Sequence, residues 1–149
     1  MDKDYKAYIA GPWFDDYAKE QLEYIKRVYK DNYYITDIDC YFPDEHNDDT
    51  PLGVYNSNVE NIKNCDFFVA LISRKDVGTA YELGIASALN KPIVLVGDNE
   101  DTFKSKTNIM LAFCTKFCIT KDKFVNYLLN KGWREEDCIK IPNSWEDKE

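Results

Sequence analysis

Residues 76–86 read DVGTAYELGIA and bring together the residue types best suited to chemistry. Two carboxylates, Asp76 and Glu82, flank the small residue Gly78. Thr79 and Glu82 have the spacing of a capping box, in which the acidic side chain reaches back to a backbone amide at the start of a helix. Because a helix N-terminus favours negative charge, we expect Glu82 to be ionised, and a carboxylate there can act as a nucleophile or stabilise a cation. The segment fits both a helix start and a catalytic centre.

The strands and helices that must position these carboxylates can be predicted from the sequence pattern, in which short apolar runs alternate with segments whose apolar residues recur every three or four positions. This alternation predicts a doubly wound, flavodoxin-like α/β fold, with a parallel five-stranded sheet and helices on both faces. We predict strands at residues 5–10, 33–37, 66–73, 92–96 and 116–120. We predict helices at residues 15–32, from 50–51 onward, at 79–90 and at 121–131.

Two of the predicted helices carry an apolar stripe that should face the sheet. The first stripe consists of Ala18, Leu22, Ile25 and Tyr29. The second consists of Leu52, Tyr55, Val59 and Ile62, in a helix opened by an N-cap threonine and a proline. The run FFVALI in the third strand is apolar throughout, which predicts burial on both faces of the sheet.

Ligands of doubly wound sheets bind beyond the carboxyl ends of the strands, where the winding direction reverses. This rule selects residues 11–14, 76–82 and 98–99. Residues 11–14, GPWF, fit two interpretations: a turn whose aromatic rings close the core, or a wall on which a planar ligand stacks.

Composition excludes several classes of function. The chain has 27 acidic and 19 basic residues, a formal net charge of -8, which argues against nucleic-acid polymers as partners. The only histidine, His46, lies in an acidic loop, which argues against a zinc site and against Ser-His-Asp or Cys-His catalysis. Neither GxGxxG nor GxxxxGK[ST] occurs, so we do not expect a dinucleotide or NTP enzyme.

Size and the remaining composition predict one cytoplasmic domain over residues 1–149. At 149 residues and 44% apolar, the chain is long enough to bury one core. The five cysteines are odd in number and form no CxxC pair, which predicts free thiols in a reducing compartment. The start of the chain does not resemble a signal peptide, and the longest apolar run, residues 67–72, is too short to span a membrane.

Four segments together resemble the nucleoside 2-deoxyribosyltransferase family, in order over about residues 5–113. They read AYIAGPWF, YNSNVENIKNCDFFVALI, DVGTAYELGIASALNKPIVLV and TNIML. In that family the glutamate of a D-x-G-x-x-x-E-x-G segment attacks the anomeric carbon of a 2'-deoxynucleoside, and a second base then opens the covalent deoxyribosyl enzyme. The resemblance assigns Glu82 as this nucleophile. It implies a 2'-deoxynucleoside donor, a free nucleobase acceptor, retention at the anomeric carbon and no metal or organic cofactor.

The resemblance also implies roles for further residues. Asp76 matches the aspartate that contacts the base and helps to move its proton. In that family a neighbouring subunit contributes an Asn-x-Met segment to the active site, and this segment matches Asn108 and Met110. The match implies a homo-oligomer built from dimers, as in the family's hexamers, in which the active sites are shared. The remaining candidates for substrate binding are Tyr8, Gly11, Trp13, Phe14, Asn58 and Gly78.

The chain departs from the family at two places. Many members carry an aspartate where this chain has Asn58, which can still face the site as an uncharged hydrogen-bonding group. Some members close the site with a terminal tyrosine carboxylate, where this chain reads WEDKE.

Two rival functions remain. A nucleotide N-glycosidase, which hydrolyses 2'-deoxynucleoside 5'-monophosphates, needs cationic or hydroxyl donors for the phosphate. The first loop reads GPWFDD, with no Arg or Ser, and this favours an uncharged nucleoside. A non-enzymatic receiver-like binding module would carry an acceptor aspartate after the third strand, where this chain has Ser73 and Arg74.

Overall fold

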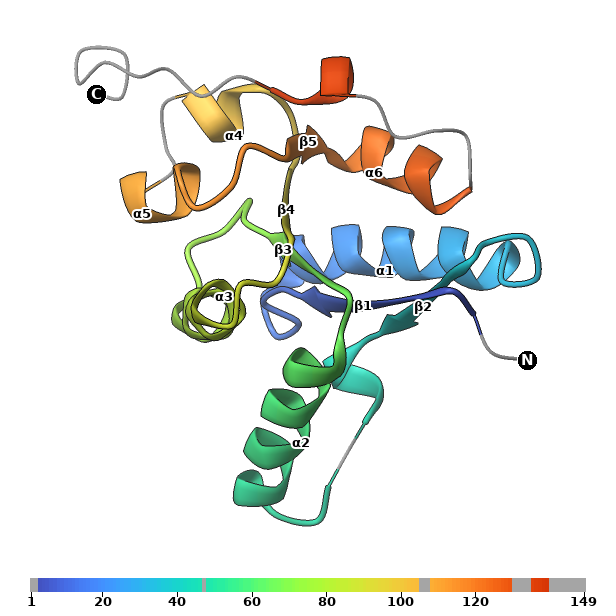
Figure 1. Ribbon diagram of the computed structural model, residues 1–149, viewed down its shortest axis with the longest axis vertical. Coiled ribbons are helices and arrows are strands. Elements are labelled where there is room, and N and C mark those ends of the chain that lie inside the picture. Colours follow the sequence, from blue (N-terminus) through green and yellow to red (C-terminus); the bar gives the residue numbers. More distant parts are fainter. Residues whose placement is uncertain (1–2, 47, 105–107, 130–134, 140–149) are drawn as a thin grey trace.

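The centre of the molecule is a parallel five-stranded sheet with the strand order β2-β1-β3-β4-β5 (Figure 1). This computed structural model describes residues 3–46, 48–104, 108–129 and 135–139. The strands are β1 (Tyr5–Ala10), β2 (Ile38–Tyr41), β3 (Phe67–Leu71), β4 (Ile93–Gly97) and β5 (Cys118–Thr120). Because the winding reverses between β1 and β3, the loops after these two strands flank the switch point.

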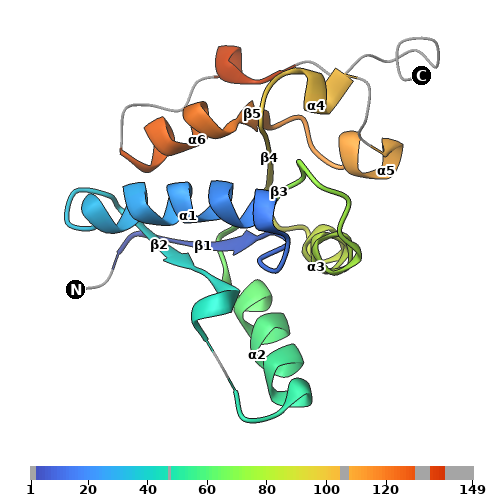
Figure 2. The ribbon, with the colours of Figure 1, turned by 180° about the vertical axis from the view of Figure 1, so that it is seen from behind.

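Helices cover both faces of the sheet (Figures 1 and 2). One face carries α1 (Asp16–Asp31) and α6 (Lys121–Leu128), and the other carries α2 (Pro51–Asn64) and α3 (Val77–Ala88). The shorter elements are α4 (Asp101–Lys104), α5 (Ile109–Ala112) and the 3-10 turns Pro43–Glu45 and Glu135–Asp137. The predicted doubly wound, flavodoxin-like fold is confirmed.

The pleat of the strands divides the core into two layers. In β1, Ala7 and Ile9 face α1, whereas Tyr8 and Ala10 face α2 and α3. All five residues of β3 are buried, as the run FFVAL predicts. The predicted stripe of α1 is confirmed, since all four of its residues are buried.

The predicted starts of two helices are also confirmed. The Asp15 carboxylate accepts a hydrogen bond from Ala18 N at 2.9 Å and caps α1. Thr50 Oγ1 accepts one from Gly53 N at 3.0 Å and caps α2, with proline in its first turn. Asn90, at φ 58, lies just past the end of α3, as the predicted stop requires.

The second strand lies later in the chain than residues 33–37, so this prediction was wrong. Tyr34 is 87% exposed, and Ile35 N donates to Asn32 O at 3.0 Å in a turn that follows α1. The strand pairs with β1 from Ile38, whose side chain is buried together with that of Cys40. Burial of these two alternate residues outweighed the β-propensity of the tyrosines.

The stripe predicted for α2 is wrong at its N-terminal end. Ile62 is fully buried, but Leu52 is 68% exposed and Tyr55 is also exposed. The helix points away from the sheet, so that only its C-terminal part packs on the core (Figure 1). The predicted last two residues of α6, 130 and 131, lie outside the described residues.

Candidate active site

The side chain of Glu82 meets β1 rather than the start of its own helix. The Tyr8 hydroxyl donates a hydrogen bond to Glu82 Oε2. The cap of α3 is Asp76, whose Oδ2 accepts from Thr79 N at 2.8 Å and from Thr79 Oγ1 at 2.6 Å. The capping box predicted for Thr79 and Glu82 is therefore wrong.

Burial controls the ionisation of Glu82. It raises the pKa of the carboxyl above its ordinary value, the hydrogen bond from Tyr8 opposes this, and the negative charge of Asp76 adds to it. The sequence argument considered only the helix N-terminus, which favours the ionised form, whereas partial burial of the side chain acts in the opposite direction. Burial, followed by the charge of Glu82, raises the pKa of the Tyr8 hydroxyl, so Tyr8 acts as a neutral donor.

A stack of rings runs from the sheet past Glu82. The Tyr8 ring lies between Phe68 and Tyr41, each with its centroid 5.3 Å away. His46 stacks on the outer side of Tyr41 at 4.3 Å, with an interplanar angle of 11°. The Tyr41 hydroxyl lies 3.4 Å from Ser57 Oγ of α2, which links the stack to that helix.

Sequence reasoning missed Tyr41, Ser57 and His46 as neighbours of this site. The signal lies in the pairing of Tyr8 with Tyr41 in the sheet register. The strand predicted at residues 33–37 ends before Tyr41, so it could not show this pairing. A strand assigned from the alternate apolar residues Ile38 and Cys40 would extend to Tyr41 and predict it.

The loop after β1 faces α1, away from the side of the sheet on which Tyr8 meets Glu82. Trp13 packs edge-on against Phe42 at 5.9 Å, and Lys26 Nζ lies 4.5 Å from the centre of its ring. A Cβ at Gly11 would lie 2.9 Å from Leu22 Cδ1, so this glycine permits a close approach to α1. Phe14 is 81% exposed. Trp13 and Gly11 thus contact residues on the α1 side of the sheet, opposite the side on which Tyr8 meets Glu82.

Asn58 lies one helical turn before Ile62 on α2. Ile62 belongs to the same buried cluster as Tyr8 and Leu83, so this side of the helix faces the region around Glu82. The side-chain oxygen of Asn58 is buried and has no hydrogen-bond partner among the described residues. It is therefore an acceptor available to a ligand.

A cavity of about 970 Å³ lies between α3 and α5. Asp76, Asn108 and Met110 are among its lining residues, whereas Glu82 and Tyr8 are not among the described residues that form its wall. Gly78 is exposed in the first turn of α3. Asn108 and Met110 thus lie on the same cavity as Asp76. Glu82 of the same chain lies on the other side of α3.

The described residues also bear on metal, thiol and membrane chemistry. They contain no group of three or more His, Cys, Asp or Glu side chains that could hold a metal ion. The five cysteines are all described and none forms a disulfide bond, which agrees with the predicted thiols. Within the same ranges, no helix has the length and apolar character needed to cross a bilayer.

Comparison with known proteins decides the family. The family model described as nucleoside 2-deoxyribosyltransferase matches residues 7–138. The chain belongs to the nucleoside 2-deoxyribosyltransferase family. The resemblance of its sequence motifs to this family is thereby confirmed.

Relatives of this 2-deoxyribosyltransferase family member share its fold. Uncharacterized protein UU063 of Ureaplasma parvum serovar 3 is 30% identical in an alignment 104 residues long that covers 62% of this chain and 66% of that protein, just under two thirds of its length. The 2-deoxyribosyltransferase of Bacillus psychrosaccharolyticus is 22% identical with a TM-score of 0.66, covering 85% of this chain and 94% of that one. The Clostridium botulinum CMP N-glycosidase BcmB is 18% identical with a TM-score of 0.57, covering 83% and 97%.

Proposed function

We propose that the protein transfers the 2-deoxyribosyl group between nucleobases through a covalent intermediate on Glu82. The observation that carries this proposal is the placement of Glu82, a half-buried carboxylate that accepts a hydrogen bond from the Tyr8 hydroxyl and is influenced by a second carboxylate, Asp76. Both faces of the Tyr8 and Tyr41 rings are covered by neighbouring rings, so a planar base would stack on this group at the outer face of His46.

The reaction proceeds in two displacements. An oxygen of Glu82 forms a bond to the anomeric carbon while the bond from that carbon to the base nitrogen breaks, and its electron pair stays with the base. We assign to Asp76 the proton that the departing base takes up. A nitrogen of the second base then attacks the same carbon, gives its proton back to Asp76 and releases the Glu82 carboxylate. Two inversions give net retention.

The remaining candidates have supporting roles in this proposal. Tyr8 holds the nucleophile before attack, because its hydrogen bond restricts the carboxylate to one orientation. Asn58 supplies an uncharged acceptor to the substrate through its buried oxygen.

We propose a nucleoside rather than a nucleotide as the donor. In many α/β folds the N-terminus of the helix after the first strand binds phosphate. Here the Asp15 carboxylate occupies that end of α1 and lies 3.7 Å from Arg74 Nε. The amides at this end of α1 are already capped by a carboxylate, which supports an uncharged donor over a 5'-monophosphate.

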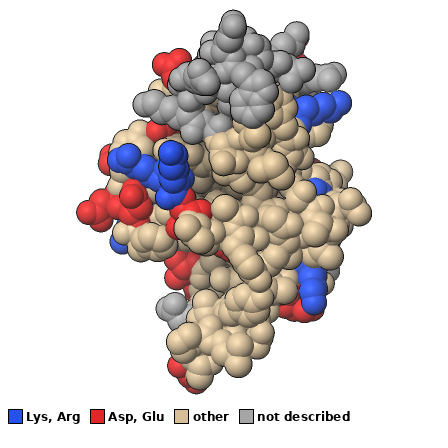
Figure 3. Space-filling model, turned by 90° about the vertical axis from the view of Figure 1, so that its left-hand side faces the viewer, with Lys and Arg blue, Asp and Glu red and all other residues tan. Residues whose placement is uncertain are grey.

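We further propose that a second copy of the chain completes the site. Asn108 and Met110 lie across α3 from Glu82, and Met110 is 76% exposed. Val77 is 88% exposed on the same side, where a broad surface lacks charged groups (Figure 3). An apolar surface of this kind is typical of an interface between protein chains.

The proposal is tested by chromatography of the protein with a 2'-deoxynucleoside, with and without a second free base. We expect new deoxynucleoside only when the acceptor is present. Glu82→Gln should lower the rate on the order of 10⁴-fold or more, because the nucleophile is lost. Glu60→Gln, at an exposed carboxylate of α2, is the matched control.

Two results would contradict the proposal. Wild-type turnover by a folded Glu82→Gln protein would remove Glu82 from the mechanism. Release of free base at the same rate with and without an acceptor would indicate a hydrolase, and 5'-monophosphates would then be compared as substrates. A deoxyribosyl adduct in the intact mass of the wild type, absent from Glu82→Gln, is expected.

A further inference from the structure

The loop between β3 and α3 is tied to neighbouring elements by side chains. After Ile72, whose amide donates to Val96 O at 3.0 Å, the chain leaves the sheet. Ser73 Oγ then donates to Asp98 Oδ1 at 2.7 Å and lies 3.3 Å from Gln21 Oε1. The loop that ends in Asp76 is therefore bound to the end of β4 and to α1.

Asp98 joins two hydroxyl groups from different elements. Its Oδ1 accepts from Ser73, and its Oδ2 accepts from the Tyr17 hydroxyl on the first turn of α1. The hydrogen bond to Asp98 also raises the pKa of the Tyr17 hydroxyl, which keeps Tyr17 protonated as a donor. One carboxylate thus uses both oxygens to connect α1, β4 and the loop.

Arg74 strengthens the same connection from the loop side. Its guanidinium lies 4.3 Å from the centre of the Tyr17 ring and 3.7 Å from Asp15 Oδ1. Contacts of a cation with an aromatic face contribute even at exposed sites. Tyr17 is consequently held at both its ring and its hydroxyl.

We propose that Ser73, Asp98 and Tyr17 form a latch that positions Asp76, and with it the start of α3, for the reaction at Glu82. This inference rests on the proposed function. Asp76 follows Ser73 by three residues and caps the helix that carries Glu82. Release of the latch loosens the cap, and a small displacement of α3 moves Glu82 relative to the bound sugar. The three are positioning residues, since they act through Asp76 and α3.

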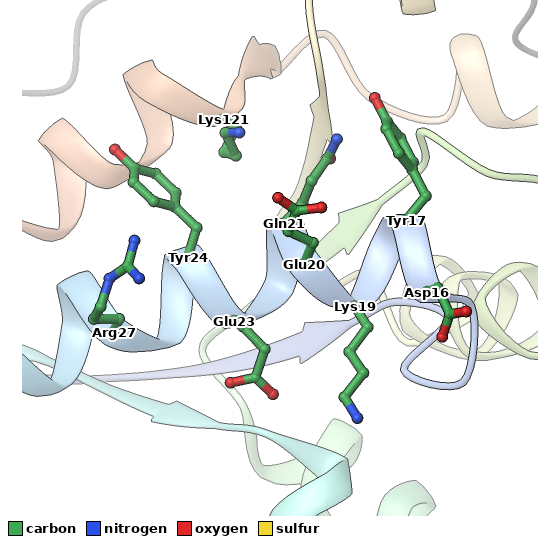
Figure 4. Close-up of a pocket in the computed structure, with 9 residues that line it drawn as sticks. All are labelled: Asp16, Tyr17, Lys19, Glu20, Gln21, Glu23, Tyr24, Arg27 and Lys121. Carbon is green, nitrogen blue, oxygen red and sulfur yellow. The ribbon is translucent and has the colours of Figure 1, made fainter.

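Tyr17 and Tyr24 offer a matched pair of variants. Both project from the same side of α1 and line one surface cavity of about 600 Å³ (Figure 4). The Tyr24 ring lies 4.9 Å from Lys121 Nζ and 5.7 Å from the Arg27 guanidinium, away from the loop after β3. Tyr24→Phe therefore removes a hydroxyl from the same helix without touching the latch.

Kinetics give the first readout. We expect Tyr17→Phe and Asp98→Asn each to lower kcat about tenfold while KM changes less than about twofold, because reacting groups are misplaced but binding contacts remain. The double variant should be no worse than the poorer single variant, since both act through one connection. Tyr24→Phe should match the wild type. Wild-type kcat in both latch variants would overturn the proposal.

Limited trypsin digestion of the full chain gives a readout that does not depend on activity. Arg74 and Lys75 are exposed within the loop, so cleavage there reports its opening. Loss of one latch hydrogen bond should speed this cleavage about fivefold, with Tyr24→Phe unchanged. Unchanged cleavage in the latch variants would overturn the proposal even if kcat fell. A wild type without base exchange would refute the proposed function, whereas the digestion would still decide whether the latch holds the loop.

Discussion

At the scale of single residues, Glu82 is under opposing influences. Withdrawal from water and the charge of Asp76 disfavour its ionised form, and the Tyr8 hydroxyl favours it. A nucleophilic carboxylate gains from this balance, because loss of solvation makes it more reactive while one hydrogen bond keeps it in place. Each neighbour can be changed alone, which separates the two influences.

The pH dependence of exchange should move in opposite directions in two variants. Glu82 attacks as the carboxylate, so the rate rises with pH through its pKa. Asp76→Asn removes a charge that raises this pKa, and the acid limb should move to lower pH. Tyr8→Phe removes the bond that lowers it, and the limb should move to higher pH. The measurement is kcat/KM against pH.

Asp16→Asn, at an exposed carboxylate of α1, is the control for these profiles and should keep the wild-type limb. If the acid limb moved in the same direction in Asp76→Asn and Tyr8→Phe, or did not move in either variant, Glu82 would not be the titrating group.

At the scale of elements, the end of β1 and helix α1 approach each other closely at one glycine. A methyl group at Gly11 would lie 2.9 Å from Leu22 Cδ1. Because Leu22 is fully buried, its side chain has little room to move away. A side chain at position 11 would therefore press directly on the core residue Leu22.

We therefore expect Gly11→Ala to lower the free energy of unfolding by about 1–3 kcal/mol through overpacking. Leu22→Ala alone should cost about 2–5 kcal/mol, since it leaves a cavity. The double variant should cost less than the sum, because the new methyl group occupies part of that cavity. Urea denaturation of the four proteins measures the coupling. Additive costs would show that the two residues do not compete for space.

At the scale of the whole molecule, a broad area on one side carries no charged groups, although the protein has a net charge of -8 (Figure 3). Helix α3 contains Glu82 as its only charged residue, and half of its surface faces outward. A helix that is apolar on most sides is normally covered. Coverage by a second copy would bring Asn108 and Met110 of one chain toward the site of another.

Mixing two defective variants tests this shared site. Glu82→Gln and Asn108→Ser should each be impaired, and serine keeps an oxygen that can cap α5 as Asn108 does. Subunits reassorted after mixing should regain about a quarter of wild-type exchange, because mixed dimers contain one intact site. Light scattering establishes the number of copies. Persistent inactivity of the mixture, with both variants still oligomeric, would place each site within one chain.

The sequence by itself determined the order of the five strands and the main helices, the burial of β3, the start of α1 and the cap Thr50. These features depend on local periodicity and on side chains that reach backbone a few residues away. It also placed Asp76 and Glu82 at the carboxyl edge of the sheet, because the strand before them is evident from its apolar run.

Only the tertiary structure decided what Glu82 contacts and where the aromatic rings lie. Tyr8 and Glu82 are 74 residues apart, and Tyr41 joins Tyr8 only through the register of β2 against β1. Trp13 lies against Phe42 and Lys26, which are 29 and 13 residues away in the chain. Such contacts depend on how strands pair and helices pack. No local pattern specifies them, because they are made between residues far apart in the chain.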